Sequence, residues 1–308
     1  MSALGTPRLH LRETTSTNDR ARVLAAAGAP HGTLVTAGAQ TAGRGRQGRT
    51  WSAPAGRSLL MSLVLREPAR LLPLIAAVGV AEAAAATTGR DIRIKWPNDV
   101  LLDGRKVAGI LAEARPQDGW AIVGIGLNVA VRPQDLPPEV RPIAATLGLE
   151  PRDVEPALAR VLVALEAALA LDTAELLDAW RDRDALWGRE ITWGAGNGRA
   201  AGIDGDGRLV VELPSGGRTA LEAGEVHQSA PAPPARRGEA PAGGPALYGP
   251  GGRPYLALPF GRLGLRAAFL ALAFALASAL ARAFALALAR ARALASAFSF
   301  RRSLSVSL

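Results

Sequence analysis

The chain has 308 residues, no cysteine and only three histidines, so disulfides and thiolate metal centres are excluded and a zinc cluster is disfavoured. Its net charge of +9 would suggest a nucleic-acid partner if the charge covered a folded surface. Residues 229–308, however, contain ten arginines and a single acidic residue, Glu239, which account for the whole excess. The rest of the chain is neutral overall, so its charge does not indicate nucleic-acid binding.

The N-terminal segment, MSALGTPRLHLRE, lacks the apolar run that a secretory signal needs, and we expect a cytoplasmic protein. Residues 8–15 alternate in polarity and predict a strand. Ser16, Thr17 and Asn18 follow as candidate N-caps of a helix over residues 19–27, because their side-chain oxygens accept hydrogen bonds from free backbone amides.

A segment rich in glycine and arginine lies between two predicted strands, residues 33–37 and residues 58–66. We call this segment, Gln40–Gly56, the arginine loop. The strand after the loop is followed by residues 71–88, whose alanine-rich composition predicts a buried helix.

Three short strands are predicted between residues 92 and 115. Asp103-Gly104 is a hairpin turn signal within them, because the favoured two-residue turn needs positive φ at both positions. Residues 120–129 continue the sheet. Two helices are then predicted over residues 154–186, with Asp172 or Thr173 as the cap of the second helix.

Residues 189–228 contain only short β-like runs separated by glycine-rich turns, which predicts a small antiparallel sheet or barrel. The predicted architecture is therefore α+β with a β appendage. We expect a catalytic domain over residues 1–186 and a second domain over residues 187–228.

The composition changes at Ser229. Proline, alanine and glycine dominate first, as in a linker, and residues 264–300 are then mostly alanine, leucine, phenylalanine and arginine. The longest uncharged part, Ala267–Ala281, has 15 residues, whereas a membrane-spanning helix needs about 20. Residues 229–308 are therefore predicted to be a linker and a low-complexity tail, disordered or helical, with no membrane contact. Out-of-frame translation of GC-rich DNA is the other interpretation.

The arginine loop contains GRGRQG at residues 43–48, which fits the pattern G-x-G-x-x-G, but no apolar helix follows it, as a dinucleotide-binding turn requires. The glycines would let the backbone approach an anion, while Arg44, Arg46 and Arg49 supply charge-assisted donors. The segment predicts a mobile clamp for a phosphate or carboxylate. A solvated basic loop is the alternative.

Lysine is almost absent from this chain. Lys95 and Lys106 are the two lysines among 36 basic residues, and they lie in one short segment. Where arginine supplies most positive charge, a retained lysine indicates either a need for a compact ammonium group or chance.

Three segments resemble the signatures of biotin protein ligases. They are QTAGRGRQGRTW at residues 40–51, KWPNDVLLDGRKVAGIL at residues 95–111 and GIGLN at residues 124–128. Ser16-Thr17-Asn18 is similar in position and order to the biotin-contacting S-T-N of that family. The resemblance implies a class II tRNA synthetase/biotin ligase-like mixed sheet with helices, plus a small C-terminal SH3-like β-barrel. It also implies two steps: biotin reacts with ATP to give biotinyl-5′-AMP, and an acceptor lysine then takes the biotin.

The resemblance implies roles for individual residues as well. Lys106 would contact the biotin carboxylate and the α-phosphate, and Arg46 would close over the intermediate, so both are predicted to be catalytic. Asp99 would bind Mg²⁺. The predicted biotin-binding residues are Ser16, Thr17, Asn18, Gln40, Gly43, Arg44, Gly45, Arg46, Lys106, Gly109 and Gly124. The predicted ATP- and adenylate-binding residues are Arg44, Arg46, Arg49, Trp51, Lys95, Asn98 and Asn128.

Simpler interpretations remain open for several of these residues. Ser16 and Thr17 would serve as helix caps alone, Pro97-Asn98-Asp99 as a turn, and Trp51 as a core aromatic. Two rival functions also remain: a lipoate ligase or octanoyltransferase, and, from a different class, a nucleic-acid-binding protein.

The resemblance implies the biotin carboxyl carrier domain of an acyl-CoA carboxylase as the acceptor. The motifs begin at Glu13, so we expect no N-terminal helix-turn-helix domain, no operator binding and no other nucleic-acid partner. A monomer or weak homodimer is expected.

Overall fold

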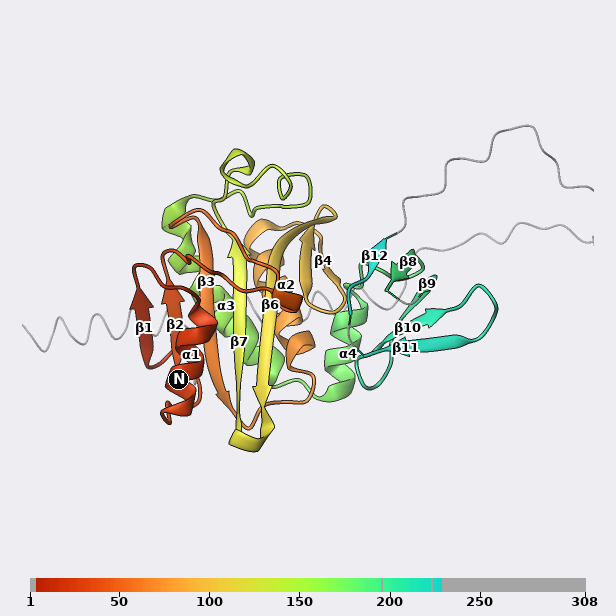
Figure 1. The fold of residues 1–308 in the computed structure, drawn as a ribbon, viewed down its shortest axis with the longest axis horizontal. Helices are drawn as coiled ribbons and strands as arrows, with labels where there is room; N and C mark the ends of the chain where they lie inside the picture. The colour runs from red at the N-terminus through yellow and green to blue at the C-terminus, as the bar shows by residue number, and fades with distance from the viewer. Residues whose placement is uncertain (1–3, 195, 223, 229–308) are drawn as a thin grey trace, which may run out of the picture. The chain divides into compact units, whose positions relative to one another are not determined.

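The computed structural model describes residues 4–194, 196–222 and 224–228, all within one compact unit, Met1–Ala235. In this part of the chain, one sheet has seven strands in the order β1-β2-β3-β7-β6-β5-β4 (Figure 1). Strands β1 and β2 are parallel and the other neighbours are antiparallel, which confirms the mixed sheet. The strands are β1 (Arg8–Leu11), β2 (Leu34–Ala37), β3 (Ser58–Arg66), β4 (Ile92–Lys95), β5 (Asp99–Leu102), β6 (Arg105–Arg115) and β7 (Trp120–Asn128).

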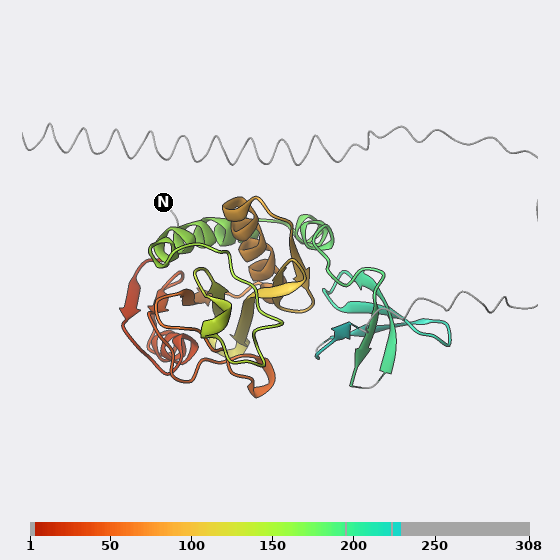
Figure 2. The same ribbon diagram turned by 90° about the horizontal axis from the view of Figure 1, so that it is seen from above.

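Helices cover both faces of this sheet (Figure 2). Helix α1 (Thr17–Ala26) packs on one face, where Ala21 and Ala25 join Val64 and Ile122 in a small buried cluster. The opposite face carries the main core and the helices α2 (Leu72–Thr88), α3 (Val154–Leu169) and α4 (Thr173–Arg181). The two faces therefore differ: α2 and α3 pack on one, whereas α1 covers the other only in part and leaves a pocket beside it.

Local sequence signals set several of these boundaries. Strand β3 has the predicted bounds, and the turn at Asp103-Gly104 has the predicted positive φ values of 50° and 73°. Asp172 caps α4, since its side chain accepts a hydrogen bond from the Glu175 amide at 2.8 Å. Ser16 occupies the N-cap position of α1 but makes no side-chain capping bond within the described residues, so that part of the cap prediction is wrong. The first strand was also predicted too long, because it ends at Leu11.

A second sheet lies toward the C-terminal end of the described residues. Its five strands are antiparallel, in the order β11-β10-β9-β8-β12, which confirms the predicted small antiparallel sheet. Closure into an SH3-like barrel and the domain boundaries stay predictions. The strands are β8 (Glu190–Trp193), β9 (Gly196–Ile203), β10 (Leu209–Glu212), β11 (Arg218–Leu221) and β12 (His227–Gln228).

The predicted linker and tail, residues 229–308, lie outside the described residues. Among the helices that the structure does describe, none combines the length and apolar character needed to cross a membrane.

The edge strand β4 joins the two sheets. Ile94 accepts a hydrogen bond from Ala185 at 2.9 Å and donates to Arg183 at 2.7 Å, so the segment after α4 runs along this edge. The Trp96 indole Nε1 donates to the Gly207 carbonyl at 3.0 Å, and the side chain is buried. These bonds hold the smaller sheet beside the end of the larger one that carries β4 and β5.

Asp184 is a buried carboxyl group at this junction. One oxygen accepts from the Leu186 amide at 2.8 Å, and Oδ2 is buried with no hydrogen-bond partner in the described part of the chain. Burial raises the pKa of Asp184 to about 6, against the smaller opposing effect of the backbone bonds from Leu186 and Trp187. The folded protein therefore keeps this proton over a pH range in which the unfolded chain, with an ordinary Asp pKa of 3.8, releases it.

The pKa of Asp184 predicts a specific pH dependence of stability. Because the folded pKa is the higher one, this group stabilises the fold fully below the unfolded pKa, and that contribution is lost as the pH rises through about 6. The loss amounts to about 2–3 kcal/mol of unfolding free energy. Asp184→Asn should remove this part of the pH dependence, as measured by urea unfolding between about pH 4 and pH 8. An unchanged difference between the two ends of that range in the variant would contradict the assignment.

Candidate active site

A pocket opens on the α1 face of the large sheet, and glycines form its floor. Gly109 on β6 pairs directly with Gly126 on β7, and Gly124 lies two residues before Gly126, so all three face the same side. Because these positions carry no side chain, the floor is bare backbone. The pocket is open to solvent and contains about 430 Å³ of empty space, its mouth included.

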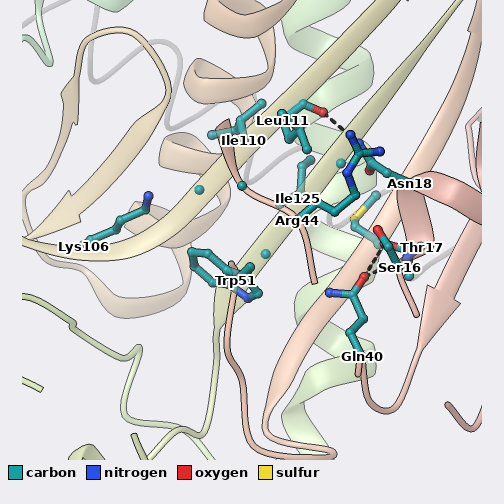
Figure 3. Close-up of a pocket in the computed structure, with 15 residues that line it drawn as sticks. Ser16, Thr17, Asn18, Gln40, Arg44, Trp51, Lys106, Ile110, Leu111 and Ile125 are labelled. Carbon is teal, nitrogen blue, oxygen red and sulfur yellow. Dashed lines mark hydrogen bonds between the residues drawn. The ribbon is translucent and has the colours of Figure 1, made fainter. Parts of the chain in front are cut away.

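Hydroxyl and amide groups from α1 and the arginine loop line one end of the pocket (Figure 3). The Thr17 amide and hydroxyl both donate to Gln40 Oε1, at 2.7 and 3.1 Å. Buried Ser62, on β3, lies 2.8 Å from Thr17 Oγ1 and 2.7 Å from Asn18 Oδ1. Ser62 therefore restrains the side chains of Thr17 and Asn18, which fixes the positions of the polar groups that a ligand would meet.

Trp51 forms a roof over the glycine floor. A Cβ added to Gly109 would lie 3.0 Å from the indole, and one added to Gly126 would overlap it. The indole Nε1 is buried and has no hydrogen-bond partner in the part of the chain that the structure describes. Trp51 is absent from the hydrophobic cores of the described residues and lines the pocket, so the site interpretation is favoured over the core aromatic.

Lys106 lies at the other end of the pocket from Thr17 and Gln40 (Figure 3). Its ammonium Nζ is 2.6 Å from Asp99 Oδ1 and 5.6 Å from the centroid of a Trp51 ring. The backbone is fixed on both sides, since Lys106 donates to Ile143 and accepts from Ala145, each at 2.7 Å. Lys106 therefore supplies a defined cation at this end of the pocket.

Further cations continue from Lys106 along the β4–β5 hairpin. Arg46 Nη1 donates to Asn98 Oδ1 at 3.2 Å, and Asn98 is itself bonded to Ile110 on β6. Burial lowers the pKa of Arg46 and of Lys95 below their ordinary values, although Asp99 opposes this effect on both. Nearby carboxylates therefore only partly stabilise the charged forms of Arg46 and Lys95. A bound anion would stabilise these charged forms further.

The three arginines of the arginine loop do not form the single cluster that the sequence suggested. Each takes a different partner: Arg44 pairs with Asp19 and Glu113, Arg46 bonds Asn98, and Arg49 Nη1 lies 2.5 Å from Glu225 Oε1. Partners on other elements, carboxylates for Arg44 and Arg49 and an amide for Arg46, therefore direct the three guanidinium groups to different places.

Most of the predicted residues come together around this pocket. Those that line it are Ser16, Thr17, Asn18, Gln40, Arg44, Gly45, Trp51, Lys106, Gly109 and Gly124. Arg46, Arg49, Lys95, Asn98 and Asp99 lie outside the lining, around the Lys106 end. At Gly43 the backbone lies close to the backbone of Trp51, whose amide donates to the Gly43 carbonyl at 2.9 Å.

Asn128 lies apart from the lining set. Its side chain is buried, donates to the Ala145 carbonyl at 2.9 Å and accepts from Ser58. The lining residues that sequence reasoning missed are Met61, Ile110, Leu111, Ile125 and Gly126. Gly126 could have been predicted from the sequence, because residues two apart in a strand lie on the same face and Gly126 follows Gly124 at that spacing.

The residues present would bind a magnesium ion only together with the phosphates of a bound nucleotide. Within the described residues, no group of three or more His, Cys, Asp and Glu side chains is arranged to hold a metal ion. Asp99 supplies one carboxylate beside Lys106. Mg²⁺ characteristically takes one or two carboxylates and completes its shell with water and phosphate oxygens.

Residues 11–129 match the profile of the Biotin/lipoate A/B protein ligase family. The Bifunctional ligase/repressor BirA of Bacillus subtilis (strain 168) is 44% identical over 140 residues, which are 43% of this chain and 43% of that protein. The biotin–(acetyl-CoA-carboxylase) ligase of Mycobacterium tuberculosis is 38% identical over 168 residues, covering 51% of this chain and 62% of that protein. This chain therefore spans less than half of the first relative and under two thirds of the second.

A similar solved structure is the biotin protein ligase from Aquifex aeolicus in complex with biotin and ATP. It is 29% identical, with a TM-score of 0.64, over 73% of this chain and 100% of that chain.

Proposed function

The chain belongs to the Biotin/lipoate A/B protein ligase family, and from this premise we propose that it is an ATP-dependent biotin protein ligase. It would form biotinyl-5′-AMP and transfer the biotin to a lysine of a biotin carboxyl carrier domain. The observation that carries this proposal is the pocket itself: a bare glycine floor with hydroxyl and amide groups at one end and the Lys106 ammonium at the other.

The two ends of the pocket suit the two ends of biotin. The ureido group has donors and a carbonyl oxygen, which Ser16, Thr17 and Gln40 would satisfy. The fused rings would lie over the glycine floor once Trp51, which covers Gly109 and Gly126, moves aside, and the valerate chain would lead the carboxylate toward Lys106. The Aquifex aeolicus neighbour, solved with biotin and ATP, supports the same pair of substrates here.

In the first step, a biotin carboxylate oxygen attacks the α-phosphorus of ATP, and the bond to pyrophosphate breaks. The attacking carboxylate and the triphosphate repel each other, so a fixed cation between them lowers the barrier. Lys106 would take this role, because an ammonium group serves oxygens on both reactants without the planar constraint of a guanidinium. In the second step, the acceptor lysine amine attacks the acyl carbon, AMP leaves, and the amine gives up a proton.

The phosphates would lie on the cationic side beyond Lys106. Arg46, Lys95 and Asn98 supply donors there, and Asp99 would share a magnesium ion with the phosphate oxygens. Arg49 and Trp51 would meet the nucleotide from the arginine loop. The adenine role of Asn128 stays a prediction, since its side chain is engaged by Ser58 and Ala145.

Arg46→Gly should release the intermediate. The Arg46–Asn98 bond joins the arginine loop to the start of β5, and a guanidinium at this place would also bind the adenylate phosphate. A charge-assisted hydrogen bond contributes about 1.5–3 kcal/mol, so we expect biotinyl-AMP to dissociate on the order of 10- to 100-fold faster. The measurement is biotinylation of an added bystander protein, detected with labelled streptavidin. Arg46→Lys, which keeps the charge, is the control, and an Arg46→Gly protein that labels no more bystander than wild type would contradict the role.

Biotin-dependent exchange of pyrophosphate into ATP tests the proposed function. The full-length protein should support exchange with biotin and none with lipoate or octanoate, and it should transfer radiolabelled biotin to a carrier domain. Exchange that depends on lipoate would favour a lipoate ligase instead. Salt-sensitive nucleic-acid binding without any exchange would support the remaining rival.

A further inference from the structure

Arg44 points away from the Lys106 end of the pocket, although it belongs to the arginine loop. Its guanidinium Nη1 lies 2.8 Å from Asp19 Oδ1, and Nη2 lies 3.3 Å from Glu113 Oε1. Asp19 is on α1 and Glu113 is on β6. One end of the arginine loop is therefore ion-paired to two carboxylates, one from the helix and one from the sheet. Arg44 itself is shown beside Asn18 in Figure 3.

A second arginine uses the same carboxylate oxygens. Arg22 Nη1 lies 3.1 Å from Asp19 Oδ1, and Arg22 Nη2 lies 2.9 Å from Glu113 Oε1. Each oxygen thus serves one nitrogen of Arg22 and one of Arg44. Because the charge on each oxygen is shared, a strong pair with one guanidinium weakens the pair with the other.

The network is connected directly to the pocket lining. Asn18, which lines the pocket, donates from Nδ2 to Glu113 Oε2 at 2.8 Å. The side chains of Asp19, Arg22, Arg44 and Glu113 are between 26% and 41% exposed, so solvent screens these pairs only partly. Several coupled pairs at one place hold a segment more firmly than one isolated surface pair.

We propose that Asp19 and Glu113 act as a latch that holds the Arg44 end of the arginine loop closed, and that Arg22 weakens the latch by competing for the same oxygens. Asp19, Glu113 and Arg22 are then positioning residues, which act on the bound intermediate through Arg44. The part of the proposal that concerns retention of biotinyl-AMP rests on the proposed function; the latch itself does not.

The competition gives the two network partners opposite effects. Asp19→Asn removes a carboxylate from Arg44, so the loop should open more often. Arg22→Gln removes the competitor and leaves both carboxylates to Arg44, so the loop should open no more often than in wild type, or less often. If the four residues only stabilised the fold, breaking the network at Asp19 or at Arg22 would change the loop in the same direction.

Limited trypsin digestion of the ligand-free, full-length protein tests the latch. Cleavage after the loop arginines requires opening, and the loop sequence is identical in both variants. Asp19→Asn should raise the cleavage rate on the order of 5-fold, and Arg22→Gln should leave it unchanged or lower it. Asp19→Glu should restore the wild-type rate, because it keeps the charge. Equal cleavage in Asp19→Asn and wild type, or acceleration by both variants, would overturn the proposal.

Dissociation of preformed biotinyl-AMP is the second measurement. Faster dissociation from Asp19→Asn, but not from Arg22→Gln, is expected. If wild type forms no biotinyl-AMP while trypsin gives the expected pattern, the latch stands and the proposed function fails. If the adenylate forms and Asp19→Asn releases it at the wild-type rate, the latch does not control retention.

Discussion

Lys106→Ala should lower the rate of biotin-dependent pyrophosphate exchange about a thousandfold. The ammonium of Lys106 is the cation nearest to the end of the pocket where the carboxylate and the α-phosphate would meet, and its backbone is fixed by bonds to Ile143 and Ala145. Without it, two anions would approach each other beside the Asp99 carboxylate, which Lys106 now neutralises at 2.6 Å. Exchange is measured with radiolabelled pyrophosphate at saturating biotin and ATP.

The control for this result is Lys106→Met, which keeps a long apolar side chain against Trp51 and Gly109 but removes the charge. Both variants should unfold at denaturant concentrations close to that of wild type and should both lose exchange. Exchange by Lys106→Met within a few-fold of wild type would show that packing, and not charge, is what Lys106 provides. Near-normal exchange by Lys106→Ala would remove this residue from the reaction altogether.

Gly124→Ala should abolish biotin binding at ordinary concentrations. The added Cβ would overlap Asn18 Oδ1. Asn18 has little freedom to move, because its amide lies 2.7 Å from Ser62 Oγ, 2.8 Å from Glu113 Oε2 and 3.3 Å from the Leu111 carbonyl, and only 3% of the residue is exposed. Moving it would leave buried polar groups without partners, at a cost of about 2–4 kcal/mol of unfolding free energy.

Titration calorimetry with biotin measures this effect. We expect the Kd to rise at least ~100-fold, since displacement of Asn18 would change the polar end of the pocket that it lines. Gly205→Ala is the matched control: a Cβ there meets nothing within 4 Å in the described part of the chain. Wild-type affinity in Gly124→Ala would show that biotin does not use this floor.

The elements of the fold could be predicted from the sequence because each is specified by a pattern of residues close together in the chain. Strand β3 is a continuous apolar run, the Asp103-Gly104 turn needs positive φ, and Asp172 caps α4 through a residue three positions away. Each depends on neighbours in the chain. The first strand was predicted too long because the alternation of polarity continues after its pairing with β2 ends at Leu11.

The site was only partly accessible, because its remaining features depend on residues far apart in the chain. The motifs pointed to Lys106, Gly109 and Gly124, which do lie together. No local pattern, however, indicates that Arg49 pairs with Glu225, 176 positions away, or that Arg44 turns to Glu113. Three arginines close together in sequence suggest one cluster of charge. The tertiary structure, however, determines which partner each of them takes.

The bare backbone beneath the pocket limits how its selectivity can be redesigned. Gly109, Gly124 and Gly126 have no side chain left to trim, so a bulkier analogue of the ligand cannot be accommodated by shortening residues on that side. Additional space has to be made above, by reducing Trp51, which lies over Gly109 and Gly126. A library directed at acceptance of larger analogues should therefore vary the covering residues and leave the strands beneath them unchanged.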